Sequence, residues 1–243
     1  MAEVSVQRPG TSEEYTGVGT LEVLASAVRY QRFLTGLMTR AAGAPAAGRN
    51  RVADFGAGLG TFARDARSLG WRVTCIELDP ALRAHLHADG FDAAESLDEV
   101  VPQSLDFLFS YNVLEHIEDD AGAVKAFHRA LKPGAPLLVY VPAFTVLYGS
   151  FDRAVGHVRR YRRNGLIDLV ESAGFAVDVC HYADSIGFAA ALAYRVTRRS
   201  AQLDERAVRL YDRFLFPASR RLDNLAYRFF GKNLVLIARR SPE

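Results

Sequence analysis

The sequence predicts an α/β protein built on a doubly wound, mostly parallel sheet. Between residues 51 and 142, short apolar runs alternate with longer segments whose apolar residues recur at helical spacing. Short strands joined by helices form right-handed crossovers, which make neighbouring strands parallel. The chain has 243 residues, 49% of them hydrophobic and 24% charged, which suits one large globular domain.

The predicted elements follow from these patterns in chain order. A polar arm comes first, and an amphipathic helix is expected over Leu21–Ala42, ended by Gly43 and Pro45. The short apolar runs predict five strands, at Arg51–Phe55, Arg72–Glu77, Phe91–Ala94, Leu105–Tyr111 and Ala135–Pro142. Helical periodicity predicts the helices between them, at Thr61–Leu69, Pro80–Asp89 and Asp120–Leu131.

The alternation breaks down after residue 142. The segment Phe144–Asn164 is rich in aromatic and basic residues and has no clear period. We expect a helix, a strand, two amphipathic helices and a last strand to follow it, at Gly165–Ala173, Phe175–His181, Ile186–Arg199, Leu203–Phe216 and Asn233–Arg239.

The charge and the cysteine content argue against several classes of protein. Lys and Arg number 30 against 28 Asp and Glu, and this net charge of +2 does not predict nucleic-acid binding. Cys75 and Cys180 lie in separate apolar runs without a C-x-x-C partner, so neither a disulfide scaffold nor a zinc site is expected. The sequence shows no signal-peptide core and no membrane-spanning run, and we therefore expect a cytoplasmic protein.

Three glycines at alternate positions follow the first predicted strand. Gly56, Gly58 and Gly60 stand between that strand and a helix, where glycine lets backbone N–H groups approach a ligand. Glu77 ends the next predicted strand, about twenty residues later. A carboxylate in that place accepts two hydrogen bonds from a ribose diol. The combination predicts an adenosine-containing ligand.

The residues around the glycines favour S-adenosylmethionine (SAM) as that ligand. The dinucleotide fingerprint G-x-G-x-x-G would need glycine where the chain has Thr61. Asp54 stands two positions before the first glycine, and its carboxylate would repel a pyrophosphate but attract the ammonium of a methionyl group. An NAD-linked oxidoreductase therefore remains the weaker alternative. A P-loop is excluded because no Gly-Lys-Ser/Thr follows the glycines.

Four segments in order, DFGAGLGTFA, CIELDP, SLDFLFSYNVLEHIEDD and LKPGAPLLVYVPA, resemble the successive motifs of class I SAM-dependent methyltransferases. They cover roughly residues 50 to 142. The resemblance implies a seven-stranded sheet in the order 3-2-1-4-5-7-6 with the last strand antiparallel, and SAM across the carboxyl ends of strands 1 to 4. It also implies an arm and covering helix at 1–45 and a methyltransferase domain at 46–243, with 144–164 and 183–230 on the acceptor side.

The resemblance carries over to individual residues. Its implied cofactor contacts are the methionine-side loop Asp54, Gly56, Ala57, Gly58 and Gly60, the ribose-side Glu77 and Leu78, the adenine-side Glu95, Ser96 and Leu97, and Tyr111 and Asn112 at the end of strand 4. The usual adenine-side aspartate is replaced by Ala93 or Ala94, a departure from the family pattern. His116 and Tyr30 are further cofactor candidates, and ordinary packing is the alternative for both.

A segment after the fifth strand carries the candidate acceptor chemistry. It resembles a D-x-x-x-G-H-x-R-R-Y stretch of one branch of these enzymes. His157 is the candidate base, with Asp152 orienting it. Asp152 and Arg160 are the candidate substrate-binding residues, and Arg160 and its neighbour Arg159 suit a carboxylate or phosphate of the acceptor. Tyr148 and Tyr161 are expected to close the site; the alternative is a rigid lid held by ion pairs.

These residues predict transfer of a methyl group from SAM to an oxygen, nitrogen or carbon of a small molecule, with no metal. A lipid-linked or nucleic-acid acceptor, and a SAM-binding module without catalysis, are the alternatives. The basic, aromatic tail from Arg195 to Lys232 has one apolar helical face, formed by Leu203, Ala207, Leu210, Phe214 and Leu215. We expect this face to pack on the core or on a second copy; an anionic membrane surface is the alternative.

Overall fold

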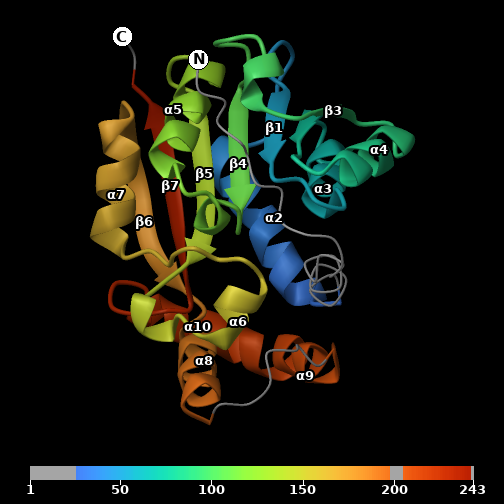
Figure 1. Ribbon diagram of the computed structural model, residues 1–243. Helices are drawn as coiled ribbons and strands as arrows, with labels where there is room; N and C mark the ends of the chain where they lie inside the picture. Colours follow the sequence, from blue (N-terminus) through green and yellow to red (C-terminus); the bar gives the residue numbers. More distant parts are fainter. Residues whose placement is uncertain (1–25, 198–204, 242–243) are drawn as a thin grey trace, which may run out of the picture.

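The computed structural model describes residues 26–197 and 205–241. It contains a seven-stranded sheet in the order β3-β2-β1-β4-β5-β7-β6, which confirms the predicted topology (Figure 1). Strands β1 to β5 pair in parallel, and β7 runs antiparallel to both of its neighbours. The strands are β1 (Arg51–Phe55), β2 (Arg72–Ile76), β3 (Asp92–Ala94), β4 (Phe107–Tyr111), β5 (Pro136–Pro142), β6 (Phe175–Ala183) and β7 (Asn233–Arg240).

Helices cover both faces of the sheet and one of its ends. The helices on the faces are α2 (Val28–Ala42), α3 (Thr61–Ser68), α4 (Pro80–Ala88), α5 (Asp120–Ala130) and α7 (Arg163–Ser172). The end helices are α6 (Ser150–Ala154), α8 (Ser185–Thr197), α9 (Glu205–Leu210), the π-helical turn η4 (Tyr211–Leu215) and α10 (Phe216–Ala226). Short 3₁₀ turns are η1 (Leu97–Glu99), η2 (Leu114–His116) and η3 (Thr145–Leu147). Among the described helices, none is both long and apolar enough to cross a membrane.

The core consists of two apolar layers separated by the sheet. Successive side chains of a strand point to opposite faces, and all seven residues of β5 are buried. Leu138 and Tyr140 of this strand pack with α2, α3 and α4, whereas Leu137 and Val139 pack with α5 and α7. A strand that is buried on both faces is typical of a doubly wound sheet.

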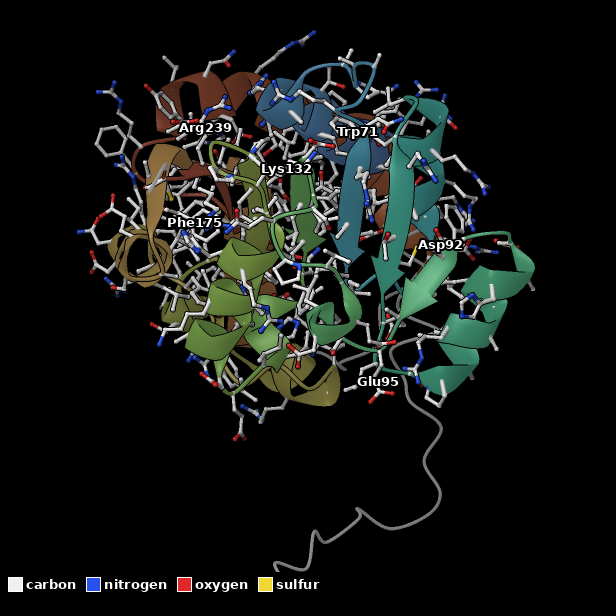
Figure 2. All side chains as sticks on the ribbon, turned by 90° about the horizontal axis from the view of Figure 1, so that it is seen from above. Trp71, Asp92, Glu95, Lys132, Phe175 and Arg239 are labelled. Carbon is white, nitrogen blue, oxygen red and sulfur yellow. The ribbon has the colours of Figure 1, made fainter. Side chains whose placement is uncertain are left out.

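The end helices define which edge of the sheet carries the loops of interest. Figure 1 shows α6, α8, α9 and α10 beyond the ends at which β4 and β5 finish. Figure 2 views the sheet from the opposite end, where strands begin at or near the labelled residues Trp71, Asp92, Lys132 and Phe175. The loops that follow β1, β2, β4 and β5 therefore leave the sheet at one edge, beside the end helices. Ligands of open α/β sheets bind at this edge.

The C-terminal helices differ from their predicted form. The helix expected to end at Phe216 instead continues through η4 into α10, with Pro217 in the first turn of α10. A proline cannot donate to the carbonyl four residues earlier, and a widened π-helical turn accommodates it. Of the two expectations for the apolar face, packing on the chain's own core is wrong for Leu210, Phe214 and Leu215, which are 59%, 60% and 46% exposed, and packing on a second copy stays a prediction. Leu203 lies outside the described residues.

Other predicted boundaries shift by a few residues. The helix predicted over Leu21–Ala42 corresponds to α2, which begins at Val28, and residues 21–25 of the prediction lie outside the described residues. Residues 198–199 of the predicted helix that corresponds to α8 also lie outside them. The segment without a clear period contains η3 and α6. Strand β6 extends two residues beyond His181 because it pairs with β7 as far as Ala183.

A carboxylate from the C-terminal helices fixes the start of α2. Ala27, at the N-cap position, has no side chain that can accept a hydrogen bond. The backbone N–H groups of Arg29 and Tyr30 instead donate to Asp212 of η4, at 3.0 and 2.8 Å. A negative charge at a helix N-terminus is stabilising, and this one joins α2 to the end helices.

Candidate active site

The loop after β1 is a tight glycine turn. Gly56, Gly58 and Gly60 all have positive φ, a conformation that residues with a Cβ rarely adopt. A Cβ on Gly56 would lie 2.2 Å from the Val113 side chain, so the β1 and β4 loops approach too closely for any other residue. The N–H groups of Gly56 and Ala57 donate to the Ile76 carbonyl, at 2.8 and 3.2 Å. The predicted loop residues therefore lie together at the edge of the sheet.

Asp54 is buried beneath this turn. It is 3% exposed, and its Oδ2 atom has no hydrogen-bond partner among the described residues. Burial and the nearby charge of Glu77 raise its pKa to about 8, although an N–H bond from Ala63 opposes the shift. A cation beside Oδ2 would restore the ionised form, so this carboxylate suits the ammonium of a methionyl group.

Glu77 connects the glycine turn to the loop after β2. Its Oε2 accepts the N–H of Gly58 at 2.8 Å, and its Oε1 accepts the N–H of Asp79 at 3.0 Å. The side chain is half-buried, and each carboxylate oxygen retains a further lone pair. Glu77 can therefore hold the turn and also accept hydrogen bonds from a ribose. Leu78, next to it, is 75% exposed.

The loop after β3 is a capped turn. Glu95 forms a 3.0 Å ion pair with Arg83, and its side chain is 60% exposed, at the rim of the molecule in Figure 2. Ser96 caps the 3₁₀ turn η1 by accepting the Asp98 N–H. Leu97 is 2% exposed and packs in the α5-side core. Its side chain is thus a core residue, which leaves its backbone for a ligand contact.

The end of β4 faces the first helix. The Tyr111 hydroxyl donates to the Leu34 carbonyl at 2.8 Å, so Tyr111 joins β4 to α2. Asn112 follows in the left-handed region, with φ of 54°. Burial raises the pKa of Tyr30 to about 12, although a hydrogen bond with the Asn112 side chain opposes this. Tyr30 of α2 and Asn112 thus meet at the edge where the glycine turn lies, and their contact with a cofactor stays a prediction.

A buried histidine–carboxylate pair forms the centre of the segment after β5. The His157 Nδ1 atom lies 2.8 Å from Asp152 Oδ1. Arg160 donates to both Asp152 oxygens, at 2.7 and 3.2 Å, and the Gly149 N–H donates to Oδ2 at 2.8 Å. Asp152 is 1% exposed, so all of these bonds are inside the protein. The carboxylate is therefore occupied, and its bond to Nδ1 fixes the orientation of the His157 ring.

The predicted role of Arg160 in binding substrate is not the one its contacts favour. Its guanidinium is buried and bonds Asp152 and, at 3.2 Å, the Ala143 carbonyl at the end of β5. Arg159 is likewise engaged, with the Glu118 carbonyl and the Asp120 carboxylate, both at 2.7 Å. Both arginines hold the segment against the sheet, in agreement with the alternative of a rigid lid.

The two predicted tyrosines anchor this segment through their hydroxyls. Tyr148 donates to the His157 carbonyl at 2.8 Å. Tyr161 is 6% exposed, and its hydroxyl lies 2.8 Å from Asp120 and 3.1 Å from the Leu114 carbonyl. These contacts favour a structural role for Tyr161 over contact with a reacting group.

Glu115 and His116 face His157 from the turn after β4. The rings of His116 and His157 meet edge to face with centroids 4.7 Å apart, and Glu115 Oε1 lies 3.8 Å from His157 Nε2. Glu115 is fully buried, and neither of its carboxylate oxygens has a hydrogen-bond partner among the described residues. Burial raises the pKa of Glu115 to about 8, and burial and the charge of His157 lower that of His116 to about 4. Near neutral pH both side chains are therefore mainly uncharged.

The same three side chains also form a set of possible metal ligands, which the sequence did not predict. One ligand atom each of Glu115, His116 and His157 lies within 4.8 Å of the other two. Two imidazoles and a carboxylate are a donor set that Zn²⁺ accepts. The cluster can thus serve either as a proton acceptor or as a metal donor set.

Sequence reasoning missed two residues of this site. Arg83 of α4 donates to the carbonyls of Glu77 and Leu78, at 2.8 and 2.6 Å, and thereby holds the turn after β2. An arginine on a helix surface has no local pattern that signals this task. Glu115 stands within the third motif but was not among the predicted site residues, although a carboxylate soon after a buried strand is a usable signal.

Sequence comparison places residues 27–179 in a family described as "Methyltransferase domain". Over 139 residues, 54% of each chain, the protein is 30% identical to a Mycolicibacterium smegmatis protein described as a probable S-adenosylmethionine-dependent methyltransferase. Over 99 residues it is 30% identical to a ubiquinone biosynthesis O-methyltransferase of Xanthomonas oryzae pv. oryzae, which covers 37% of the chain and 41% of that protein. The chain thus spans about half the length, or less, of these curated relatives.

Solved structures show the same fold at lower identity. Phosphoethanolamine N-methyltransferase 2 of Haemonchus contortus, in complex with SAM, superposes with a TM-score of 0.57 at 21% identity, over 86% of this chain and 52% of that one. A SAM-dependent methyltransferase from Archaeoglobus fulgidus gives 0.56 at 15% identity, over 86% and 94%. With the strand order and the glycine turn that is hydrogen-bonded to Glu77, these matches lead to one conclusion: the chain belongs to the methyltransferase-domain family and has the fold of the class I SAM-dependent methyltransferases.

Proposed function

We propose that this protein transfers a methyl group from SAM to an oxygen, nitrogen or carbon atom of a small molecule. SAM, when bound, supplies a methyl group that its positively charged sulfur has already activated. The residues that would hold it are Asp54, the glycine turn and Glu77, with Tyr30 and Asn112 at the far side. The unpartnered Oδ2 of Asp54 beneath the turn supports a cationic ligand there.

The observation that carries a catalytic role is the His157–Asp152 pair. An acceptor hydroxyl loses a proton as it gains the methyl group, and an ammonium must lose a proton before its nitrogen can attack the methyl carbon. Asp152 holds His157 through Nδ1, which leaves Nε2 as the proton acceptor. His157 lies on the segment that follows β5, and the glycine turn follows β1. Both segments start at the same edge of the sheet. The protein must mainly align the two reactants, and such positioning supplies roughly 7–11 kcal/mol.

Replacing His157 with alanine is expected to lower turnover by about 10²–10⁴-fold, the contribution typical of a general base. SAM affinity should stay within about twofold, because no SAM-holding residue is changed. The assay follows radiolabelled methyl groups from SAM into extracted metabolites, with His85→Ala, an exposed histidine of α4, as the matched control. Activity should survive a chelator. Equal turnover in His157→Ala and His85→Ala would show that His157 has only a structural role. Loss of activity on adding the chelator would favour a bound metal ion over a general base.

SAM binding near pH 7 is expected to release a proton from Asp54. The pKa of about 8 keeps this carboxyl mainly protonated in the free protein, and a bound ammonium would favour the ionised form. Calorimetry in buffers of different ionisation enthalpy measures the release. Above about pH 9 it should vanish, because Asp54 is then already ionised. Asp54→Asn should abolish it, and identical buffer dependence in both proteins would contradict this assignment.

A lipid-linked acceptor is the second candidate, favoured by the exposed apolar side chains of the end helices. The exposed residues on these helices are Leu210, Phe214, Leu215, Leu222 and Leu225, and exposed Phe229 lies in the turn after α10; arginines of the same helices lie beside them. Such a surface suits an anionic membrane or a second copy of the chain. Radiolabel recovered in an organic extract rather than in water-soluble metabolites would support this candidate.

Cys75 and Cys180 are both free and buried, which suits the cytoplasmic location we propose.

A further inference from the structure

A hollow between α2 and the α9–η4 helix is lined by a group of basic side chains. Its volume is about 730 Å³, within the range of small-molecule sites. The arginines that line it are Arg29, Arg32, Arg206, Arg209 and Arg213. Among the described residues, Asp212 is the one carboxylate of the lining. Methyl transfer as proposed above gives no role to this concentration of positive charge.

Local geometry explains why these arginines share one hollow. Arg29 and Arg32 lie three positions apart in the first turns of α2, so both point to the same side of that helix. Arg206 and Arg209 repeat this spacing on α9, and Arg213 follows within the π-helical turn. The bonds from α2 to Asp212 hold the two helices side by side.

The carboxylates nearby leave the hollow positive. Asp212 is 7% exposed, and its two oxygens accept the backbone N–H groups of Arg29 and Tyr30. Its charge therefore compensates the N-terminus of α2, whose N–H groups are not available to a ligand. Glu205 pairs with Arg209, but both side chains are 52% exposed, where an ion pair contributes little. The guanidinium groups of Arg29, Arg32 and Arg213 are thus the attractive feature of the hollow.

We propose that this hollow binds a phosphate or diphosphate group. A guanidinium is planar and presents paired donors that match phosphate oxygens. Several such cations held on two helices repel one another, and a bound polyanion would remove that repulsion. Leu210 completes the lining and is 59% exposed, so an apolar chain attached to the phosphate would also find contact. The ligand is therefore a soluble phosphate compound or a lipid headgroup.

This inference does not depend on methyl transfer. Arg29 precedes Tyr30, whose side chain faces Asn112 on the inner side of α2, so the hollow and the proposed SAM site share this helix without sharing a side chain. Binding is measured directly, and SAM binding serves as a separate readout of the fold. Failure of one proposal is therefore distinguishable from failure of the other.

The test is calorimetric titration of the full chain with pyrophosphate at about 0.15 M salt, where weak surface attraction is screened. Saturable binding is expected. Arg32→Gln/Arg213→Gln should weaken it at least about tenfold, because two charge-assisted contacts are lost. The control Arg40→Gln/Arg72→Gln removes the same charge from exposed arginines at the far end of α2 and the start of β2. It should bind pyrophosphate within about twofold of the wild type, and all variants should bind SAM equally.

A second arm separates the two phosphate sources. The protein is sedimented with vesicles of phosphatidylglycerol and phosphatidylcholine, with and without pyrophosphate. Vesicle binding that pyrophosphate displaces supports a lipid headgroup, and pyrophosphate binding without vesicle binding supports a soluble phosphate compound. The proposal is overturned if pyrophosphate does not bind, if only vesicles bind, or if the control variant weakens as much as the test variant.

Discussion

Replacing Asp152 with alanine is expected to destabilise the folded protein by about 3–5 kcal/mol, the cost of removing one partner from a buried ion pair. Asp152 is 1% exposed and bonds His157, Arg160 and the Gly149 N–H. Without it, the guanidinium of Arg160 remains buried next to the Ala143 carbonyl alone. Urea denaturation measures the change.

The matched control for Asp152 is a carboxylate in an exposed ion pair. Asp178 pairs with Arg239 at 2.9 Å, and these side chains are 41% and 50% exposed. Asp178→Ala should cost less than about 1 kcal/mol. Equal losses from Asp152→Ala and Asp178→Ala would show that the buried cluster contributes no more to stability than a surface pair.

Asp152 should also determine part of the acid sensitivity. Burial alone would raise its pKa, but the bonds from His157 and Arg160 outweigh burial and lower the pKa to about 2. A depressed pKa stabilises the fold above the unfolded value near 3.8, and this contribution is lost as pH falls through about 2. Asp152→Asn should therefore flatten the stability profile between about pH 4 and 2. An unchanged profile would contradict the lowered pKa.

Replacing Glu77 with alanine is expected to weaken SAM binding at least about tenfold, and the structure gives two reasons for this loss. The ribose hydroxyls would lose their proposed acceptor. The N–H groups of Gly58 and Asp79 would lose the carboxylate that joins them, so the glycine turn would no longer be held to the loop after β2. Calorimetric titration with SAM measures the affinity.

Glu77→Gln separates these two effects. Its amide oxygen can accept one of the two N–H bonds, so the turn should be partly retained and affinity should lie between the wild type and Glu77→Ala. Thermal unfolding without SAM reports the turn alone, because no ligand is present. Unchanged SAM affinity in Glu77→Ala would remove this residue from the proposed site, whatever its effect on unfolding.

Much of the fold was predictable because local rules act on short stretches of chain. The alternation of apolar runs and helical periods predicted strands β1 to β5, and the motif resemblance predicted their order with β7 and β6. The glycine turn was predictable for the same reason, since positive φ is a local demand that glycine meets. Local rules failed at Pro217, where a π-helical turn extended the helix beyond its predicted end.

The sequence by itself predicted strands β1 to β5, the glycine turn and the carboxylate that follows β2, because each depends on the preferences of neighbouring residues; the strand order came from the motif resemblance. Only the tertiary structure decided which side chains meet across distant segments. It joined Asp212 to the start of α2, and His157 to Glu115 and His116. It also turned Arg160 inward to Asp152 and left Phe214 in solvent. Such pairings depend on how helices and loops pack, and the spacing of residues within one segment does not predict which residues of another segment they will contact.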